Sequence, residues 1–579
     1  MIARRPASTV AEEPRHRSVA VIVPRAHSRL RNPLVWVACL AVAALVLRVV
    51  GISFGLPYHY HWDEPTLLNR VIRMGSGDLN PHYFWYPSLL MYVGLLLEGM
   101  LYLGGHAVGV YQSPDAFAAA YFENSTGVYL AARILVATIG VLTVVLTFVV
   151  GRRFFSTPVA LAGAALLAVA PIQVASSHFF TTDVPMTCFV LAAYVMLWNV
   201  YAKGRRRDYV MAGVLIGLGI ATKYLPGLLL ASLLIAHLGG VRRRTGTWRP
   251  TLDAGDFALG VAAAGAAFFV ASPFVFLDWG TALHDYSLLS AQKTAQGCVD
   301  CPLSFLPYVT AAVPWSVGPV AYVVGLAGLV SAFWQIPSRR IELALFWSFP
   351  VLLFVVVGSG RQPLARYLVP LAPFLALAAA DVFWRAGESL ARSFRVPQVR
   401  LGAAALFVLV AIVPAAIVSA RYDAYLTQPD PRTAAAAWFA AHVPAGTTIA
   451  VQPIQERYFL TAPIMTESQL AAVEAYIPTS KTSLRRTVDD YFRSRVVYPD
   501  VPFVYDLNAL RAGGVRYIVL SSAHFHNVDP AIEDPFYAQL ASVGRVAAQF
   551  SPRMELPDPG LYPVYQPTIT IYEVPSETS

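Results

Sequence analysis

The chain of 579 residues is 56% hydrophobic and only 13% charged, about half the charged fraction of an ordinary soluble domain. This composition excludes a soluble globular protein. Because the apolar residues fall into stretches of about 20, it indicates many crossings of a bilayer. The net charge of +9 does not indicate a nucleic-acid binder. The basic residues stand in short clusters between apolar stretches, as the positive-inside rule describes, and form no stripe that would follow phosphates.

The N-terminal residues 1–32 are rich in Arg, Pro and Ser, which predicts a disordered cytoplasmic tail. The first apolar stretch, 33–54, then leaves the cytoplasm, and the last is 400–420. The stretches between them are 127–151, 157–179, 184–201, 209–222, 224–240, 255–277, 307–333, 341–358 and 368–386. The basic clusters allow these helices to alternate in direction. We therefore expect a polytopic α-helical protein of the cell (inner or plasma) membrane, with a membrane module at 33–420 and about 11 transmembrane helices.

One further stretch, 88–110, is apolar enough to span the membrane but conflicts with this alternation. A crossing there would place the later arginine clusters outside. Glu98 and a Gly-Gly pair also weaken a lone span. We expect this segment to lie along the membrane or to enter and return, inside one large external loop at 55–126.

After residue 420 the composition changes. The run 432–443 predicts an amphipathic helix, and the apolar runs 447–453, 515–522 and 568–575 predict strands. Residues 421–579 are therefore expected to form a soluble α/β or α+β domain on the external side. Cys298 and Cys301 fall in another external loop, where an oxidising compartment would let them form a disulfide.

The first external loop contains the acidic pair Asp63-Glu64 beside several His, Tyr and Trp residues. A solvated loop with an interfacial aromatic belt accounts for part of this composition. Asp63, however, follows a span and stands between Trp62 and Pro65, where partial desolvation makes a carboxylate more basic. That suits a general base for an alcohol nucleophile, with Glu64 orienting it or binding acceptor.

Asp183 is expected at a similar depth on the same side, in a short connection between two spans. An N-cap role before Val184-Pro185 explains it equally well. The two carboxylates together would bind an acceptor or a divalent cation, for which Asp63, Asp183 and His61 are the candidate ligands.

Cations are expected at the same membrane face, against the positive-inside bias. They are Lys223, Arg361, Arg366 and Arg133, with Arg48 as a fifth candidate. Each alone is explained by snorkelling of the side chain to the interface. As a group they indicate an anionic headgroup, such as a lipid phosphate.

Several short motifs then follow one another in a fixed order. They are D-E-P at 63–65, L-N-P at 79–81, F-W-Y-P-S at 84–88, A-A-R at 131–133, G-R-R-F-F at 151–155, S-H-F-F-T-T-D at 177–183, T-K-Y at 222–224 and A-R-Y-L-V-P-L-A-P at 365–373. Over about residues 33–420 the chain resembles the GT-C glycosyltransferases of the protein O-mannosyltransferase and lipid A aminoarabinose transferase type, a family 39-like group.

The resemblance implies transfer of a sugar from a polyprenyl-phosphate donor to a hydroxyl of a protein, lipid or cell-envelope glycan on the external face, usually with inversion. It matches the family's first-loop acid to Asp63 or Glu64 and its second-loop acid to Asp183. Beside them, the residues expected to bind sugar or acceptor are His61, Tyr86, His178, Tyr224 and Tyr367. Three alternatives remain: transfer of a whole oligosaccharide, a catalytically silent relative that serves as an assembly partner, and a transporter. A transporter is disfavoured because the notable charges gather at one face and no inverted repeat is visible.

Overall fold

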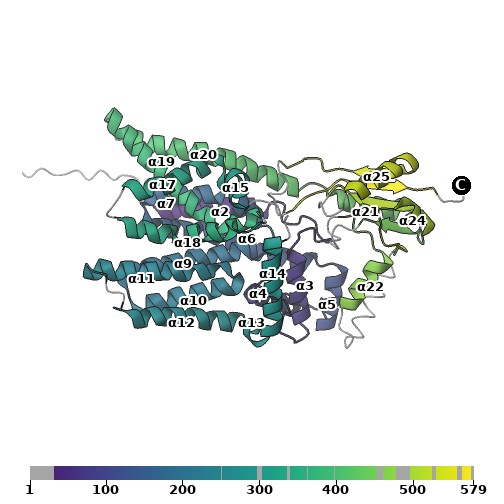
Figure 1. The fold of residues 1–579 in the computed structure, drawn as a ribbon, viewed down its shortest axis with the longest axis horizontal. Helices are drawn as coiled ribbons and strands as arrows, with labels where there is room; N and C mark the ends of the chain where they lie inside the picture. The colour runs from purple at the N-terminus through teal and green to yellow at the C-terminus, as the bar shows by residue number, and fades with distance from the viewer. Residues whose placement is uncertain are drawn as a thin grey trace, which may run out of the picture.

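The computed structural model describes residues 32–248, 251–295, 303–335, 339–361, 363–396, 398–452, 461–476, 496–523, 530–556 and 564–575. Residues 1–31 of the predicted tail at 1–32 lie outside these residues, as does the Cys298/Cys301 pair. Figure 1 shows a bundle of long helices with a small mixed domain at one end.

Up to residue 426 the described chain consists of helices and their connections. The helices are α2 (Pro33–Val49), α3 (Glu64–Met74), α4 (Leu89–Ala107), α5 (Pro114–Glu123), α6 (Thr126–Phe154), α7 (Thr157–Ala168), α8 (Pro171–Ser176), α9 (Asp183–Lys203), α10 (Arg206–Thr222), η1 (Leu225–Leu228), α11 (Leu229–Thr245), α12 (Ala254–Ala271), α13 (Phe274–Leu277), α14 (Trp279–Ala295), α15 (Phe305–Pro307), η2 (Tyr308–Ala312), α16 (Val313–Val317), α17 (Pro319–Gln335), α18 (Arg340–Gly358), η4 (Ala365–Leu371), α19 (Ala372–Phe394) and α20 (Gln398–Leu426).

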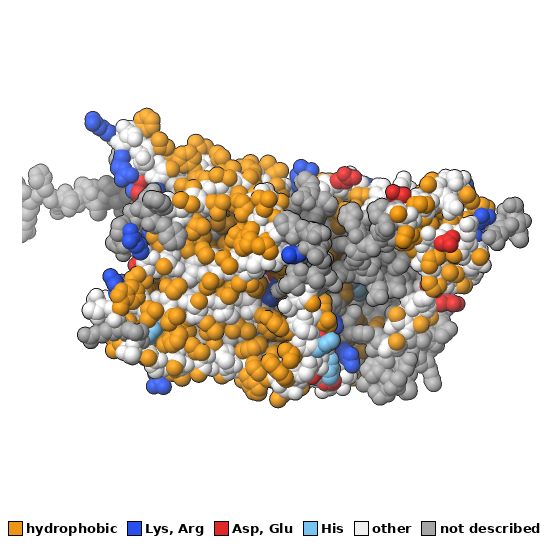
Figure 2. Space-filling model, in the orientation of Figure 1, with side chains coloured by type: hydrophobic (Ala, Val, Ile, Leu, Met, Phe, Trp, Pro, Cys, Tyr) orange, Lys and Arg blue, Asp and Glu red, His pale blue; other side chains and the backbone are white. Residues whose placement is uncertain are grey.

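Each of the eleven predicted spans falls on one or more helices of this bundle. By length and composition, eight helices of the described chain are able to cross a membrane, or nine if the bent pair Phe305–Val317 and Pro319–Ser331 is one span. The helices α2 and α7 are apolar but shorter. Figure 2 shows hydrophobic side chains over the outer face of the long helices. The protein is therefore a multi-pass membrane protein, while the number eleven stays a prediction.

The apolar stretch 88–110, whose course was in question, forms the helix α4. It is one continuous helix, so the expected alternative of a segment that enters and returns is wrong for these residues. At its start, the Ser88 N–H donates to Ser272 Oγ at the end of α12. Near its other end, Tyr102 contacts Phe117 of α5, and α5 packs through Ala119 on Leu470 of the C-terminal domain.

Both ends of α4 therefore lie at the end of the bundle that carries the C-terminal domain. In Figure 1, α3, α5 and α14 run crosswise to the long helices in this layer, and α4 packs on α3. Although α4 is long and apolar enough to cross, this placement supports the prediction that it does not.

The C-terminal domain contains α21 (Pro431–His442), β1 (Ile449–Val451), α22 (Glu467–Tyr476), α24 (Leu507–Ala512), β2 (Tyr517–Ser521), α25 (Pro530–Val543), β3 (Arg545–Phe550) and β4 (Ile569–Glu573). The sheet order is β1-β2-β4-β3, with β1 parallel to β2 and the other pairs antiparallel. Phe439 of α21 packs on one face of the sheet, and Phe536 of α25 packs on the other.

The three predicted strands and the predicted helix are present in this domain. The strand β3 was not predicted, because its sequence RVAAQF is half exposed and rich in Ala and Gln, which are weak strand formers. Its pairing with β4 provides the stabilisation that local sequence lacks. Tyr425, at the end of α20, accepts the N–H of Gln566 and so joins this domain to the last helix of the bundle.

The helices α10 and α12 pack closely because small residues face each other. A Cβ added at Gly217 would overlap the carbonyl oxygen of Ala264, and one added at Gly213 would overlap that of Gly260. Small residues four apart allow two helix backbones to approach in a membrane.

We therefore expect Gly217→Val to separate α10 from α12 and to destabilise the fold by about 1–3 kcal/mol or more. The measurement is the melting temperature of the detergent-solubilised protein. Gly265→Val is the matched control, since an added Cβ there meets nothing within 4 Å. Equal melting temperatures for the two variants would contradict the packing argument.

Candidate active site

The candidate site lies where four segments meet at the end of the bundle nearest the C-terminal domain. They are the start of α3, the start of α9, the residue after α10 and the helix η4. The first and the last of these segments carry Asp63 and Arg366, which are in contact although 303 residues separate them in the sequence.

The carboxylate of Asp63 forms an ion pair with the guanidinium of Arg366. Both side chains keep access to solvent, with 22% of Asp63 and 27% of Arg366 exposed. Arg366 Nε has no hydrogen-bond acceptor among the described atoms. The pair is therefore accessible, whereas this Nε atom is itself buried.

A second ion pair stands beside the first. Asp183 begins α9, Lys223 directly follows α10, and Lys223 Nζ lies 2.5 Å from Asp183 Oδ1. Both side chains are at least nine-tenths buried. Arg366 interacts electrostatically with Asp183 as well as with Asp63, so the two pairs form one cluster.

Aromatic rings enclose the buried cation of this cluster. Lys223 Nζ lies 5.7 Å from the ring centre of Tyr86 and 5.0 Å from that of Tyr367. Burial, reinforced by Asp63, raises the pKa of Tyr86 well above its usual value, so its hydroxyl remains a proton donor. Tyr224 fixes the segment that carries Tyr86, because its hydroxyl donates to the carbonyl of Phe84 at 2.8 Å.

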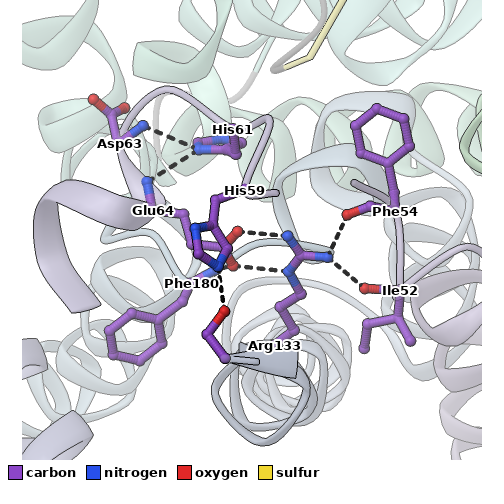
Figure 3. A network of polar contacts seen from close by, with 9 residues as sticks. Ile52, Phe54, His59, His61, Asp63, Glu64, Arg133 and Phe180 are labelled. Atoms are coloured by element: carbon purple, nitrogen blue, oxygen red, sulfur yellow. Dashed lines mark hydrogen bonds and ion pairs between the residues drawn. The ribbon is translucent and has the colours of Figure 1, made fainter. Parts of the chain in front are cut away.

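Glu64 is directed elsewhere and is fully buried with Arg133 (Figure 3). Arg133 donates to both carboxylate oxygens at 2.9 and 2.6 Å, and its third nitrogen donates to the carbonyls of Ile52 and Phe54. Glu64 also accepts the N–H of Phe180 at 3.0 Å. This geometry corrects the predicted catalytic role of Glu64 and the predicted phosphate-binding role of Arg133, because their polar atoms already hold the loop together.

His61 has a structural contact that the sequence did not suggest. Its Nδ1 accepts the N–H groups of Asp63 and Glu64 at 3.1 and 3.3 Å (Figure 3). Burial, the largest cause, lowers the pKa of His61 to about 3; Glu64 opposes this effect, and Arg366 and Arg133 add to it. The ring is therefore neutral, with its proton on Nε2.

Three predicted residues remain outside the cluster or at its edge. Both ring nitrogens of His178 lie 2.9 Å from backbone carbonyls, those of Val174 and Val50, which replaces its predicted sugar-binding role with a structural one. Arg48 is buried in α2 and donates to the carbonyls of Ala44 and Ala168. Arg361 is half-buried in the segment between α18 and η4, and its predicted role stays a prediction.

Two aromatic residues of the site were not singled out from the sequence. Phe179 lies between the His61 ring, at 4.5 Å, and the Arg133 guanidinium, at 5.1 Å. Tyr83 lies 3.8 Å from the Arg70 guanidinium and interacts electrostatically with Asp63. The adjacent aromatic residues in S-H-F-F and Y-F-W-Y could have pointed to these two residues, but such pairs occur both in packed cores and in binding sites.

The residues suggested for a divalent cation do not fit one. Asp63 and Asp183 each carry a cationic partner, and Nδ1 of His61 is taken by two N–H donors. Among the described residues no group of three His, Cys, Asp or Glu is arranged to hold a metal ion.

Comparisons with known proteins bear on this arrangement. Residues 117–276 match the family model described as dolichyl-phosphate-mannose-protein mannosyltransferase, a segment that contains Arg133, Asp183 and Lys223. No curated protein matches the chain. The structure of apo ArnT from Cupriavidus metallidurans is 16% identical, with 95% of this chain and 98% of that chain covered and a TM-score of 0.52.

Two other solved structures align less closely. ArnT bound to undecaprenyl phosphate is 16% identical, with 94% and 98% covered and a TM-score of 0.49. The apo oligosaccharyltransferase of Archaeoglobus fulgidus is 12% identical, with 86% and 70% covered and a TM-score of 0.48.

The chain has the GT-C fold. The likeness to apo ArnT over nearly the whole of both chains confirms the predicted fold class. The family-model match confirms the prediction of a glycosyltransferase. The roles of individual residues in this GT-C chain rest on the geometry above.

We expect Glu64→Gln to destabilise the protein by about 3–5 kcal/mol, because it leaves Arg133 as a buried and uncompensated charge. The measurement is the melting temperature in detergent. Glu342→Gln is the control, since its ion pair with Arg339 is partly exposed and surface pairs contribute about 1 kcal/mol or less. A Glu64→Gln protein with normal melting temperature and no transfer activity would restore a catalytic role to Glu64.

We also expect His61 to make stability depend on pH. Below pH about 6.5 the unfolded chain binds a proton on this residue, whereas the folded state binds it only near pH 3. The contribution of His61 to the free energy of unfolding is therefore constant above pH 6.5. Below that pH it falls on acidification by about 1.4 kcal/mol per pH unit. Melting temperatures from pH 7.5 to 5 should decline more steeply for wild type than for His61→Asn. Parallel curves would contradict this linkage.

Proposed function

We propose that the protein transfers a sugar from a polyprenyl-phosphate donor to an acceptor hydroxyl at the end of the bundle that holds the two ion pairs. The general base is assigned from the exposed fractions of the three carboxylate side chains at this end, those of Asp63, Asp183 and Glu64. Asp63 is 22% exposed, Asp183 is 6% exposed and Glu64 is fully buried. Of the three, Asp63 is therefore the carboxylate that an incoming hydroxyl reaches.

The donor phosphate is assigned to Arg366, with Lys223 beside it and Arg361 in the connection that precedes η4. The side chain of Arg366 is 27% exposed, so its guanidinium is accessible. A phosphate that binds Arg366 competes with Asp63 for the same cation. Donor binding would thus release the Asp63 carboxylate from its ion pair and make it available to the acceptor.

In the proposed reaction, the acceptor oxygen attacks the anomeric carbon while the bond from that carbon to the phosphate oxygen breaks. The hydroxyl proton passes to Asp63, and polyprenyl phosphate leaves with its new negative charge held by Arg366. One displacement inverts the anomeric centre, and no covalent glycosyl-enzyme forms. Asp183 keeps Lys223 and the flanking Tyr86 and Tyr367 in place beside the sugar.

The donor class is supported by the description of the matching family, which names a dolichyl-phosphate sugar. The acceptor is a protein, lipid or cell-envelope glycan. The proposed orientation places residues 1–32 in the cytoplasm, 33–420 in the cell membrane and 421–579 outside. Figure 2 supports it, since Lys and Arg side chains gather at the bundle end away from the C-terminal domain.

The test is transfer by the reconstituted protein from a labelled polyprenyl-phosphate monosaccharide. We expect Asp63→Asn to lower the rate by about 10²–10⁴-fold, as loss of a general base does. Arg366→Gln should lower it by about 10²–10³-fold, as loss of one charge-stabilising donor does.

The matched control is Asp253→Asn. Asp253 pairs with Arg244 at 2.6 Å, but at the opposite end of the bundle, between α11 and α12. Its variant should transfer sugar at the wild-type rate. Wild-type rates for Asp63→Asn would overturn the proposal. Transfer from an oligosaccharide diphosphate donor alone would favour oligosaccharide transfer, and specific uptake into vesicles without transfer would favour a transporter.

A further inference from the structure

We propose that His61 is a positioning residue, whose Nδ1 holds the backbone N–H groups of Asp63 and Glu64 at the start of α3 and thereby keeps the Asp63 carboxylate directed at Arg366. This inference rests on the proposed function of Asp63. In this role His61 makes none of the contacts with sugar, acceptor or metal that the sequence had predicted, but holds another residue in place.

The start of α3 creates a conflict for Asp63. The first N–H groups of a helix have no acceptor within the helix, and Asp at the N-cap commonly accepts one of them. In this chain the N-cap residues Asp430 and Asp506 do so, with extended backbone angles, and each accepts the N–H two residues on. The residue two positions after Asp63 is Pro65, which has no N–H to offer. A carboxylate bound in this way would be turned toward its own helix and away from Arg366.

Asp63 differs from these two residues although it also occupies an N-cap. Its backbone lies in the right-handed helical region, with φ −100° and ψ −20°, and its side chain makes no capping hydrogen bond. Figure 3 shows its carboxylate pointing away from the Glu64–Arg133 pair and from the His61 ring. The carboxylate is instead engaged with Arg366.

His61 Nδ1 restrains the backbone of Asp63 from the other side. It receives the N–H groups of Asp63 and Glu64, and the residue is only 3% exposed. The ring is stacked at 4.5 Å and 30° on Phe179, four residues before Asp183. The segment that carries the second acid therefore fixes the ring that orients the first.

The residue before His61 is held from the other side. The Arg432 guanidinium lies 3.7 Å from the ring centre of Tyr60, and the hydroxyl groups of Tyr60 and Thr433 are 2.9 Å apart. Because Arg432 and Thr433 belong to α21, the C-terminal domain restrains the same segment. His61 is thus fixed by contacts on both sides and has little freedom to follow a substrate.

The test compares His61→Phe, which keeps a ring for Phe179 but has no acceptor, with His61→Asn, which keeps an acceptor. We expect His61→Phe to lower kcat for sugar transfer at least tenfold with little change in the donor KM. His61→Asn should recover most of that loss. In an Asp63→Asn background, His61→Phe should lower the residual rate no further. His106→Phe changes an exposed histidine in the last turn of α4; it is the control and should match wild type.

Failure of this inference is distinguishable from failure of the proposed function. If Asp63→Asn abolishes transfer while His61→Phe has the wild-type kcat, the positioning role is overturned and the base remains. If His61→Phe and His61→Asn lose activity equally, the acceptor atom is irrelevant and the inference is wrong. A raised KM with unchanged kcat in His61→Phe would show contact with substrate instead. Wild-type transfer by Asp63→Asn would overturn the proposed function itself.

Discussion

The structure of the site depends on the buried ion pair between Glu64 and Arg133. Arg133, in the first long helix after the loop, binds both oxygens of Glu64 and the carbonyls of Ile52 and Phe54. Glu64 in turn accepts the N–H of Phe180. A fully buried pair is costly to desolvate, and it persists because nearly every polar atom has a partner. Through it, three segments distant in sequence acquire fixed positions.

This constraint separates the duties of two adjacent carboxylates. Successive residues at a helix start point about 100° apart, so Glu64 faces the bundle interior while Asp63 faces the opening. His61 completes the separation by accepting the backbone N–H groups of Asp63 and Glu64, which holds the backbone at this helix start. One carboxylate thus provides stability, and the other remains accessible to solvent and to Arg366.

The remaining charges are arranged as accessible and enclosed pairs. Asp63 and Arg366 are partly exposed, whereas Asp183 and Lys223 are buried beside Tyr86 and Tyr367. An enclosed pair keeps its geometry when a substrate arrives, and an accessible pair can exchange partners with it. The proposed competition between Asp63 and a donor phosphate for Arg366 follows from this difference. The neighbouring C-terminal domain restrains the loop through Tyr60.

The sequence by itself determined the membrane class, the position of each long helix and the gathering of Asp63, Asp183, Lys223 and Arg366 at one end. Hydrophobic length and the distribution of basic residues are local signals that survive without any knowledge of packing. Only the tertiary structure decided that Glu64 and Arg133 neutralise each other, that His178 binds backbone carbonyls and that β3 joins the sheet. These contacts form between residues far apart in the sequence, in places from which packing excludes water. No local sequence pattern specifies them.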